Sequence, residues 1–416
     1  MPLTKSSEFV ELHGRKYQLP TQPLVAVCID GFDPEYLERG CKDGILPVLT
    51  RWMKTGFHTT ARCAMPSLTC PNNLSIITGA PTSIHGIAGN YFLDKFSKQE
   101  HMVLDDSTMH GSTILADLAD AGKRVAAITA KDKLRRIIQH GLSPVKGAIC
   151  FSSQCASECS LEEHGIANVA SWLGQPLPPQ YSGELSLFVL DAGLKLLQEG
   201  RVDVMYLTLS DYIQHKYAPG APEADDFMSK IDTRLGALEQ AGALIAVTGD
   251  HGMSAKSAEN GSPNVLFLED FLASQWPETQ PRVICPIADS FVKHHGALGG
   301  FVRVHFMVEC PQKIDQILGA IRDLPQVFLA WTGDEAAANL EMPVDREGDI
   351  VVIANKDAVI GARSSEHDMS IFASHPLRSH GGLSEQEIPL LRSQAIANCR
   401  DREWRNFDIF DLLLNH

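Results

Sequence analysis

Four short apolar runs, each ending in turn residues, constrain the fold of this chain more than any other feature. They cover residues 24–29, 125–129, 204–209 and 243–247. Stretches with helical periodicity precede three of the runs, over residues 114–121, 185–198 and 226–240. Strands that alternate with helices are typical of βαβ units, in which helices cover both faces of a mainly parallel sheet. The sequence therefore predicts an α/β fold.

Each of these predicted strands is followed closely by a polar or charged side chain. Asp30 ends the first run, Lys131 follows the second, Asp211 the third, and Asp250 with His251 the fourth. A single Asp after a strand is more often a turn former or a helix cap than a ligand. Ligands of open α/β sheets, however, gather at the carboxyl ends of the strands. Polar groups at all four ends therefore favour a functional site there.

The segment 265–370 differs in pattern from the rest of the chain, and we expect it to be an inserted α+β cap. Its expected elements are a strand over residues 301–308, a helix over 312–322 and a strand over 350–354. The residues on either side of it, 1–264 and 371–416, would form the α/β core, with a C-terminal helix near residues 404–414.

Carboxylate and imidazole pairs recur at spacings that suit metal binding. Asp250 and His251 are adjacent, and Asp211 and His215 lie four residues apart, so that on a helix both would face the same side. His380 stands before two glycines, which allow a close approach of the backbone. Alone, an Asp/His pair of this spacing is more often a surface hydrogen bond, and His380 a plain loop residue. Such side chains bind zinc, although manganese or iron also accepts them.

Thr69 lies at the expected start of a helix, because Pro71 suits the first turn. Its hydroxyl could simply cap that helix. A helix N-terminus also receives a phosphoryl group well, since its free amides and its dipole point toward the anion. Thr69 is therefore a candidate nucleophile as well as a candidate cap.

Six elements together resemble, in order and spacing, the alkaline phosphatase superfamily and its nucleotide pyrophosphatase/phosphodiesterase branch. They are Asp30 after a buried strand, Thr69 in Pro-Ser-Leu-Thr-Cys-Pro-Asn, Gly-Ile-Ala-Gly-Asn90, Asp211 with His215, Asp250-His251-Gly, and His380-Gly-Gly. The match covers residues 24–261 and then continues from residue 380. The resemblance implies an alkaline phosphatase-like core with two zinc ions. One ion would be held by Asp30, Asp250, His251 and the Thr69 oxygen, and the other by Asp211, His215 and His380.

Within that branch the chain looks most like the phosphonoacetate hydrolases, because Lys131 and Lys133 follow a central strand in Thr-Ala-Lys-Asp-Lys. The resemblance implies that these lysines hold the substrate carboxylate, whereas the alternative is two solvated lysines at a helix start. It also implies that Thr69 forms a phosphothreonine intermediate while Asn90 and the Cys70 amide bind the phosphoryl oxygens. The implied reaction is hydrolysis of the carbon–phosphorus bond of phosphonoacetate to acetate and phosphate.

The amino-acid composition limits the classes of molecule that this protein is expected to bind. The formal net charge is -15, which disfavours nucleic acid, while metal ions could still attract a small anionic phosphonate. The 10 cysteines are scattered without a leader peptide, and no apolar stretch is long enough to cross a membrane, so we expect reduced thiols and a cytoplasmic protein without a membrane partner. The sequence leaves open whether the protein forms a homodimer.

Three other functions are compatible with the sequence. A phosphodiesterase or nucleotide pyrophosphatase would need an aromatic slot, which Tyr212 or Phe92 could supply. A mutase or sulfatase is disfavoured, since sulfatases need a Cys or Ser nucleophile where Thr69 stands. A metal-stabilised binding protein without activity is the third alternative. Several polar residues of the expected cap have no assigned role: Arg282, Asp289, His294, His295 and Arg363.

Overall fold

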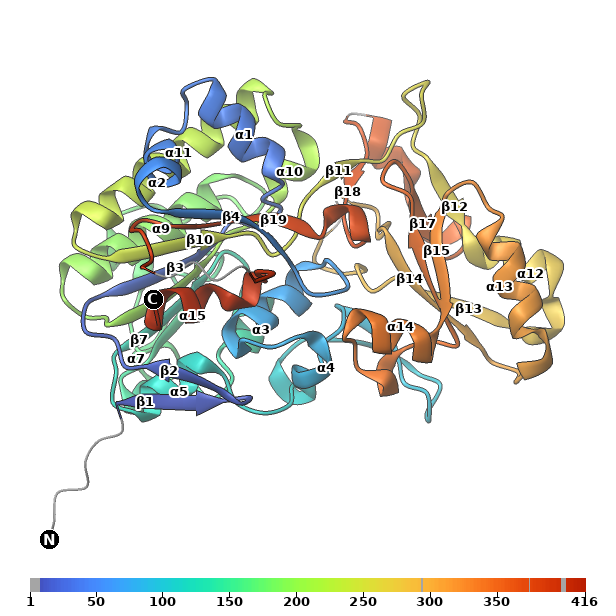
Figure 1. The fold of residues 1–416 in the computed structure, drawn as a ribbon, viewed down its shortest axis with the longest axis horizontal. Helices are drawn as coiled ribbons and strands as arrows, with labels where there is room; N and C mark the ends of the chain where they lie inside the picture. The colour runs from blue at the N-terminus through green and yellow to red at the C-terminus, as the bar shows by residue number, and fades with distance from the viewer. Residues whose placement is uncertain (1–7, 293–294, 374, 398–401) are drawn as a thin grey trace, which may run out of the picture.

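A seven-stranded sheet in the order β4-β19-β10-β3-β9-β7-β8 forms the centre of the larger part of the molecule (Figure 1). The computed structural model describes residues 8–292, 295–373, 375–397 and 402–416. The strands of this sheet are β3 (Leu24–Cys28), β4 (Phe57–Arg62), β7 (Val125–Thr129), β8 (Ile149–Ser152), β9 (Val204–Thr208), β10 (Leu244–Thr248) and β19 (Glu387–Arg392).

The five strands from β10 to β8 run parallel to one another, which confirms the predicted α/β fold with a mainly parallel sheet. β19 runs in the opposite direction and pairs antiparallel with both β10 and β4. The sequence reasoning missed β4 and β19. Neither has the continuous apolar run of a buried parallel strand: β4 has three exposed residues, and β19 carries a proline.

Helices cover both faces of the sheet because alternate strand residues point to opposite sides. In β3, Val25 and Val27 pack with one group of helices, whereas Leu24 and Ala26 pack with the other. The first group contains α1 (Pro34–Lys42), α2 (Pro47–Thr55), α8 (Val169–Leu173), α9 (Glu184–Gln198) and α11 (Pro222–Gln240). The second contains α3 (Thr69–Thr78), α5 (Ile114–Asp120), α6 (Asp132–Ile138) and α15 (Ile409–Leu414). The last helix is shorter than expected, because a 3-10 turn over Asn406–Asp408 precedes it.

A second, four-stranded antiparallel sheet in the order β13-β14-β16-β15 lies beside the core (Figure 1). Its strands are β13 (Pro281–Ile284), β14 (Phe301–Phe306), β15 (Val327–Thr332) and β16 (Ile350–Ala354), and its helices are α12 (Leu268–Gln275), α13 (Ile314–Arg322) and α14 (Gly333–Leu340). The expected strand over 350–354 is found, whereas the one over 301–308 ends two residues earlier. This part has a hydrophobic cluster of its own. The domain boundaries at residues 265 and 370 stay a prediction.

The remaining helices and strands are short. They are β1 (Phe9–Leu12) with β2 (Arg15–Gln18), β5 (Tyr91–Leu93) with β6 (Glu100–Met102), β11 (Ser254–Ala255) with β18 (Arg378–Ser379), β12 (Val265–Phe267) with β17 (Val359–Gly361), and the helices α4 (Thr82–His85), α7 (Leu161–His164) and α10 (Tyr212–Lys216). Within the described ranges every cysteine is a free thiol, as expected. Among the described helices, none combines the length and the apolar character that crossing a bilayer requires.

Candidate active site

A cavity of about 340 Å³ opens at the carboxyl ends of the central strands, between the core and the loop that follows β13. Most of the residues predicted for the site line it: Asp30, Thr69, Cys70, Asn90, Lys131, Lys133, Asp211 and His380. The other three, His215, Asp250 and His251, are buried: His215 pairs with Asp211 and His251 with Asp30 of that lining, and Asp250 accepts from the amide of Gly31, next to Asp30. The fold thus brings all the predicted site residues to one place, from segments up to 350 positions apart.

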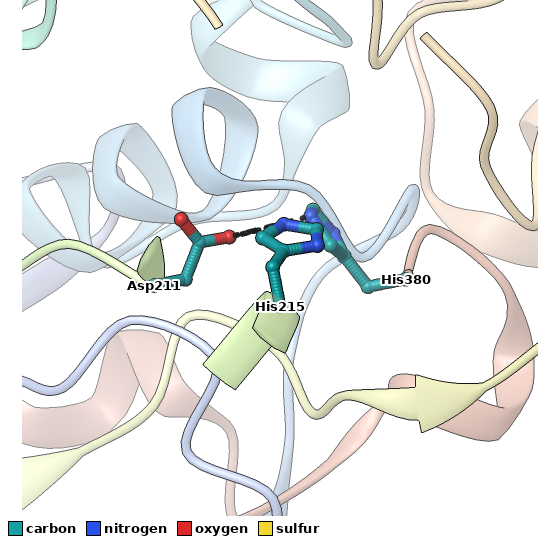
Figure 2. Close-up of side chains that lie close together, drawn as sticks. All are labelled: Asp211, His215 and His380. Carbon is teal, nitrogen blue, oxygen red and sulfur yellow. Dashed lines mark ion pairs between the residues drawn. The ribbon is translucent and has the colours of Figure 1, made fainter. Parts of the chain in front are cut away.

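One group of possible metal ligands consists of Asp211, His215 and His380 (Figure 2). Asp211 is the N-cap residue of α10, and His215 lies one turn later in that short helix. His215 Nε2 is 2.8 Å from Asp211 Oδ2, and His380 Nε2 is 3.7 Å from the same oxygen. The potential ligand atoms of the three residues all lie within 4.8 Å of one another. Both residues are buried, so this i,i+4 pair lies inside the protein rather than on its surface.

A second group shares Asp211 and adds Asp30 and His251. His251 Nε2 is 3.2 Å from Asp30 Oδ1. Asp250 stands slightly apart from this group: its Oδ1 accepts hydrogen bonds from the amides of Gly31 and His251, and lies 3.8 Å from His251 Nε2. A direct metal bond from Asp250 stays a prediction.

The three histidine rings are oriented in the same way. Nδ1 of His215 lies 2.8 Å from the Arg378 carbonyl oxygen, Nδ1 of His251 2.8 Å from that of Gly252, and Nδ1 of His380 2.9 Å from that of Ser67. A carbonyl oxygen can only accept, so each Nδ1 carries the proton of its ring. Each Nε2 therefore faces the carboxylates, an orientation typical of metal-bound histidines.

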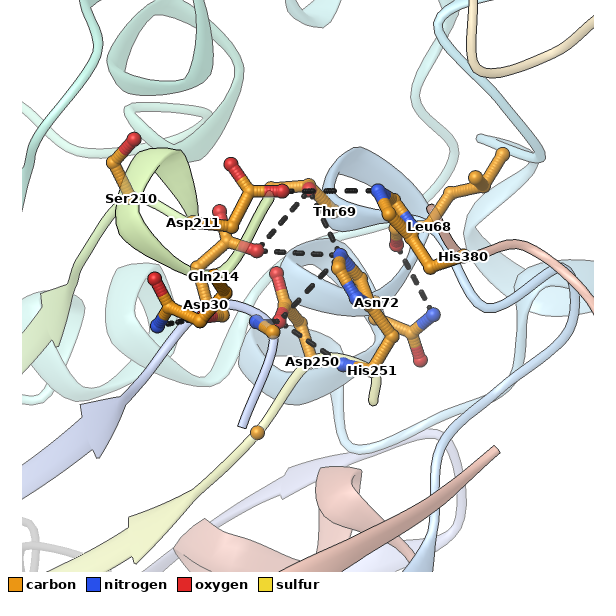
Figure 3. A network of polar contacts seen from close by, with 12 residues as sticks. Asp30, Leu68, Thr69, Asn72, Ser210, Asp211, Gln214, Asp250, His251 and His380 are labelled. Atoms are coloured by element: carbon orange, nitrogen blue, oxygen red, sulfur yellow. Dashed lines mark hydrogen bonds and ion pairs between the residues drawn. The ribbon is translucent and has the colours of Figure 1, made fainter. Parts of the chain in front are cut away.

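Burial shifts the pKa values of several side chains in this cluster (Figure 3). It raises the pKa of Asp30 well above its usual range, and the charges of Asp211 and Asp250 raise it further. Burial opposes the charged form of His251, but the carboxylates of Asp250 and Asp30 outweigh that effect and raise its pKa to about 10. The pKa of His380 falls well below its usual value through burial and through the neighbouring His251 and His215. Buried carboxylates that repel one another and draw positive charge toward them are the environment that a cation stabilises.

Thr69 is the first residue of α3, and its side chain points toward the cluster (Figure 3). Its Oγ1 lies 3.1 Å from His251 Nε2 and 3.4 Å from Asp30 Oδ1. Leu68 is the N-cap residue of α3, and no side chain caps the helix. The alternative of a purely capping hydroxyl is therefore wrong, and the Thr69 oxygen faces the possible metal ligands.

Two asparagines that the sequence reasoning missed hold this arrangement together. Asn73 donates to the Thr69 carbonyl at 2.9 Å and to Asp250 Oδ2 at 3.1 Å, while its Oδ1 accepts from the Tyr206 hydroxyl. Asn72 bonds the backbone before α3, donating to the Ala64, Pro66 and Leu68 carbonyls. The i,i+4 spacing of Thr69 and Asn73 was a usable signal, because such residues share a helix face.

The two lysines lie at the start of α6, are partly buried and bond other protein groups, which favours a role in the cavity over two solvated lysines. Lys131 donates to the Gln180 carbonyl at 2.8 Å, and its Nζ is 5.1 Å from the centre of the Tyr181 ring. Burial lowers the pKa of Lys131, although the charge of Asp211 opposes this effect. Lys133 donates to Asn90 Oδ1 at 2.9 Å and to Asp289 Oδ2 at 2.5 Å.

Asn90 is held from both sides of the cavity. Its backbone amide donates to the Pro286 carbonyl at 2.8 Å, and its carbonyl accepts from the Val103 amide. Because an ammonium group can only donate, the bond from Lys133 assigns Oδ1 to the side facing that lysine. The Asn90 NH₂ group is thereby left on the other side, where one hydrogen makes a long contact of 3.4 Å with the Ile287 carbonyl. An amide in this orientation can donate to a phosphoryl oxygen.

The unassigned polar residues separate into two sets. Asp289 and His295 line the cavity, and the His295 ring is 5.6 Å from that of His215. Arg282 and Arg363 instead form ion pairs with Glu269 and do not line it. His294 lies outside the described residues. The suggested aromatic slot is also absent at the expected places, since neither Tyr212 nor Phe92 lines the cavity.

Residues 24–382 match the family model described as type I phosphodiesterase / nucleotide pyrophosphatase. The chain belongs to this family. It is similar over 98% of both chains to crystal structures of phosphonoacetate hydrolase from Sinorhizobium meliloti 1021, with 41% sequence identity. The TM-scores are 0.92 for the complex with phosphonoformate and 0.93 for the complex with phosphonoacetate. Murine ectonucleotide pyrophosphatase / phosphodiesterase 5 shares the fold, with a TM-score of 0.61 and 18% identity over 95% of this chain and 94% of that one.

Curated relatives match over shorter segments. Phosphonoacetate hydrolase of Penicillium oxalicum is 66% identical over 32 residues, which are 8% of this chain and 44% of that protein. Human ectonucleotide pyrophosphatase/phosphodiesterase family member 1 is 39% identical over 75 residues, 18% of this chain. The chain thus spans less than half of the first curated protein and 8% of the second. The resemblance drawn from the motifs is confirmed at the level of the family.

Proposed function

We propose that this protein hydrolyses phosphonoacetate to acetate and phosphate, using two metal ions and Thr69 as the nucleophile. The observation that carries the proposal is that two partly buried lysines share one cavity with Thr69 and the Asp/His cluster. Lysines suit a carboxylate and a metal cluster suits a phosphonate, so the cavity is complementary to a molecule that contains both. The Sinorhizobium meliloti relative, solved with phosphonoacetate bound, supports the same substrate.

The donor set fits a pair of divalent ions. Two carboxylates, Asp30 and Asp211, and three imidazole Nε2 atoms converge in a buried space beside Asp250, and Nδ1 of each ring already faces a carbonyl oxygen. The residues that would hold one ion are Asp30, Asp250, His251 and the Thr69 oxygen, and those that would hold the other are Asp211, His215 and His380. Zinc ions bound there would lower the pKa of a hydroxyl or a water and offset the charge of the phosphonate.

The first chemical step is proposed to be attack of Thr69 Oγ1 on phosphorus. A new P–O bond forms as the C–P bond breaks, which gives phosphothreonine, and the hydroxyl proton is lost. Thr69 is well placed for this step, since α3 directs its free N-terminal amides and the positive end of its dipole toward the same point. The amide of Cys70 and the NH₂ group of Asn90 would bind the non-bridging phosphoryl oxygens.

Breaking the C–P bond is the difficult part of this step, because the leaving group is a carbon atom. The methylene group takes the bonding electron pair and must gain a proton to become the methyl group of acetate. Charge that spreads into the adjacent carboxylate is stabilised if positive groups hold that carboxylate. Lys131 and Lys133 lie two residues apart at the start of α6 and can contribute in this way. In the second step water attacks the phosphothreonine, the O–P bond breaks, and phosphate leaves as Thr69 regains its proton.

The direct test is phosphate release from phosphonoacetate by the zinc-loaded protein, with a p-nitrophenyl phosphodiester as the comparison substrate. We expect turnover of phosphonoacetate, its loss on chelation, and recovery when zinc is added back. Manganese and iron, added to the chelated protein, would show which ion restores most activity. Turnover of the phosphodiester far above that of phosphonoacetate would contradict the proposal and favour a phosphodiesterase.

A further inference from the structure

Lys133, one of the two lysines proposed to hold the substrate carboxylate, already contacts a carboxylate of the protein. Its Nζ lies 2.5 Å from Asp289 Oδ2, in an ion pair that spans 156 positions of the sequence. Both side chains are largely buried, with 13% of Lys133 and 6% of Asp289 exposed. Asp289 also lines the cavity. The protein therefore places a carboxylate of its own where the carboxylate of the substrate is expected.

The loop that carries Asp289 is anchored near β13, where Asn90 bonds the Pro286 and Ile287 carbonyls, whereas the Asp289 side chain itself bonds Lys133 and one amide of its own loop. Asp289 Oδ1 accepts from the Phe291 amide at 2.8 Å, and the Asp289 carbonyl accepts from the Val292 amide at 3.1 Å. Across the cavity, the Tyr181 hydroxyl donates to the Phe291 carbonyl at 3.3 Å, and both of these aromatic residues are exposed. The segment next to Tyr181 also supplies the Gln180 carbonyl that accepts from Lys131. In this arrangement both lysines are bound by protein groups, and only the partner of Lys133 carries a charge.

We propose that Asp289 occupies the carboxylate subsite in place of substrate and that the substrate carboxylate displaces it from Lys133. The inference rests on the proposed function. Two carboxylates beside one partly buried ammonium group repel each other, so the second can bind there only when the first moves away. A ligand that brings its own carboxylate restores the ion pair of Lys133 after the exchange. A ligand without one leaves Lys133 paired with Asp289 and gains nothing at this subsite.

Asp289 is thus a specificity residue in this scheme. It lowers the affinity for carboxylated phosphonates, and it prevents Lys133 from attracting other small anions.

Asp289→Asn tests this role, because the amide keeps the shape and an acceptor oxygen for Lys133 while the competing charge is lost. Binding is best measured by calorimetry on zinc-loaded protein that carries Thr69→Ala, so that no turnover occurs. The ligands are phosphonoacetate and methylphosphonate, which differ in the carboxylate. Asp315→Asn, at the exposed start of α13 and outside the cavity lining, controls for the loss of one negative charge.

With Asp289→Asn, the Kd of phosphonoacetate should fall by about tenfold, the size of one nearby-charge effect, while that of methylphosphonate changes by less than about threefold. Asp315→Asn should change neither value by more than about twofold. Weaker binding of phosphonoacetate to the Asp289 variant would overturn the inference, because Asp289 would then hold Lys133 in position. Equal tightening of both ligands, or no change, would overturn it as well. If the protein with Asp289 intact binds phosphonoacetate yet releases no phosphate when Thr69 is present, the proposed function fails while the binding comparison still stands.

Discussion

The two walls of the cavity are built differently. On the core wall, Asp250 accepts three hydrogen bonds from Gly31, His251 and Asn73, and each metal-site histidine is oriented by a backbone carbonyl. On the opposite wall, the loop after β13 presents Asp289, whose side chain bonds one amide and one lysine. The groups proposed for bond breaking thus lie on strand ends and a helix start, whereas the group proposed to select the substrate lies on a loop.

This difference agrees with the roles proposed for the two walls. Phosphoryl transfer requires its groups to be held within fractions of an ångström, which strand ends and tightly bonded turns can provide. Selection by exchange of one carboxylate for another requires only that the Asp289 side chain can move, and groups on loops open at lower cost than groups on strand ends. The four predictions below test this contrast, beginning with the core wall.

Thr69→Ala should produce the largest effect, a loss of at least about 10⁴-fold in kcat for phosphonoacetate, because the nucleophile is removed from an otherwise intact site. The Kd of phosphonoacetate should change little, since the lysines and the Asp/His cluster remain. Steady-state phosphate release and calorimetry measure the two quantities. Thr69→Ser is the matched control and should keep measurable activity. Retention of full activity by the alanine variant would show that the core wall does not carry the chemistry as proposed.

Arg303→Met should destabilise the part of the molecule that carries the second wall. Arg303 on β14 forms a buried two-bond ion pair with Glu347, at 2.7 and 2.8 Å, and donates to the Ala88 carbonyl near Asn90. Removing one partner leaves an unpaired buried charge, which costs about 3–5 kcal/mol of unfolding free energy. Urea unfolding measures this loss. The double variant Arg303→Met with Glu347→Leu should regain most of it, and failure to do so would point to the Ala88 bond as the main contribution.

Lys133→Met should lower kcat/KM for phosphonoacetate by about 100-fold, because the charged contact to the substrate carboxylate is lost. It should change the hydrolysis of p-nitrophenyl phosphate, which has no carboxylate, by less than about threefold. Lys216→Met is a matched control, since Lys216 is a partly buried lysine that bonds the Tyr212 hydroxyl and does not line the cavity. Equal losses on both substrates would mean that Lys133 acts through Asn90 rather than on the carboxylate.

Replacement of His85 should produce the smallest of the four effects, a change in how the free energy of unfolding depends on pH. It lies in the core, its Nδ1 accepts from the Ile87 amide, and its Nε2 is 2.9 Å from Ser75 Oγ. Burial lowers its pKa to about 3, with help from the positive charge of Arg346. The unfolded chain therefore binds a proton at higher pH than the folded protein does.

The contribution of His85 is accordingly full above about pH 6.5 and is lost as the pH falls toward 3, by up to about 1.4 kcal/mol per pH unit. His85→Gln removes this dependence, so urea unfolding of the variant at pH 7, 6 and 5 should show a weaker decline than that of the unaltered protein. Because both proteins share the metal-site residues, the contribution of those residues cancels in the comparison. Parallel curves would contradict the prediction.

Much of the fold could be predicted from local sequence patterns. The continuous apolar runs predicted β3, β7, β9 and β10 within about one residue, because burial on both faces leaves a clear signal. The strands β4 and β19 lacked that signal, since the edge strand β4 is half-exposed and β19 carries a proline and two charged residues. In the site, the i,i+4 spacing placed Asp211 and His215 together correctly. Nothing near Lys133 indicated Asp289, which lies 156 positions away.

The sequence by itself determined which reactive groups the chain carries and that they follow strands, because strand and helix periodicity is a local property. Only the tertiary structure decided their partners: that Asp211 belongs to both ligand groups, that Nδ1 of each site histidine faces a carbonyl oxygen, and that Lys133 is paired with Asp289. Apart from the contact between His251 and Gly252, these contacts join segments far apart in the chain. They depend on how those segments pack against one another, which no local pattern encodes.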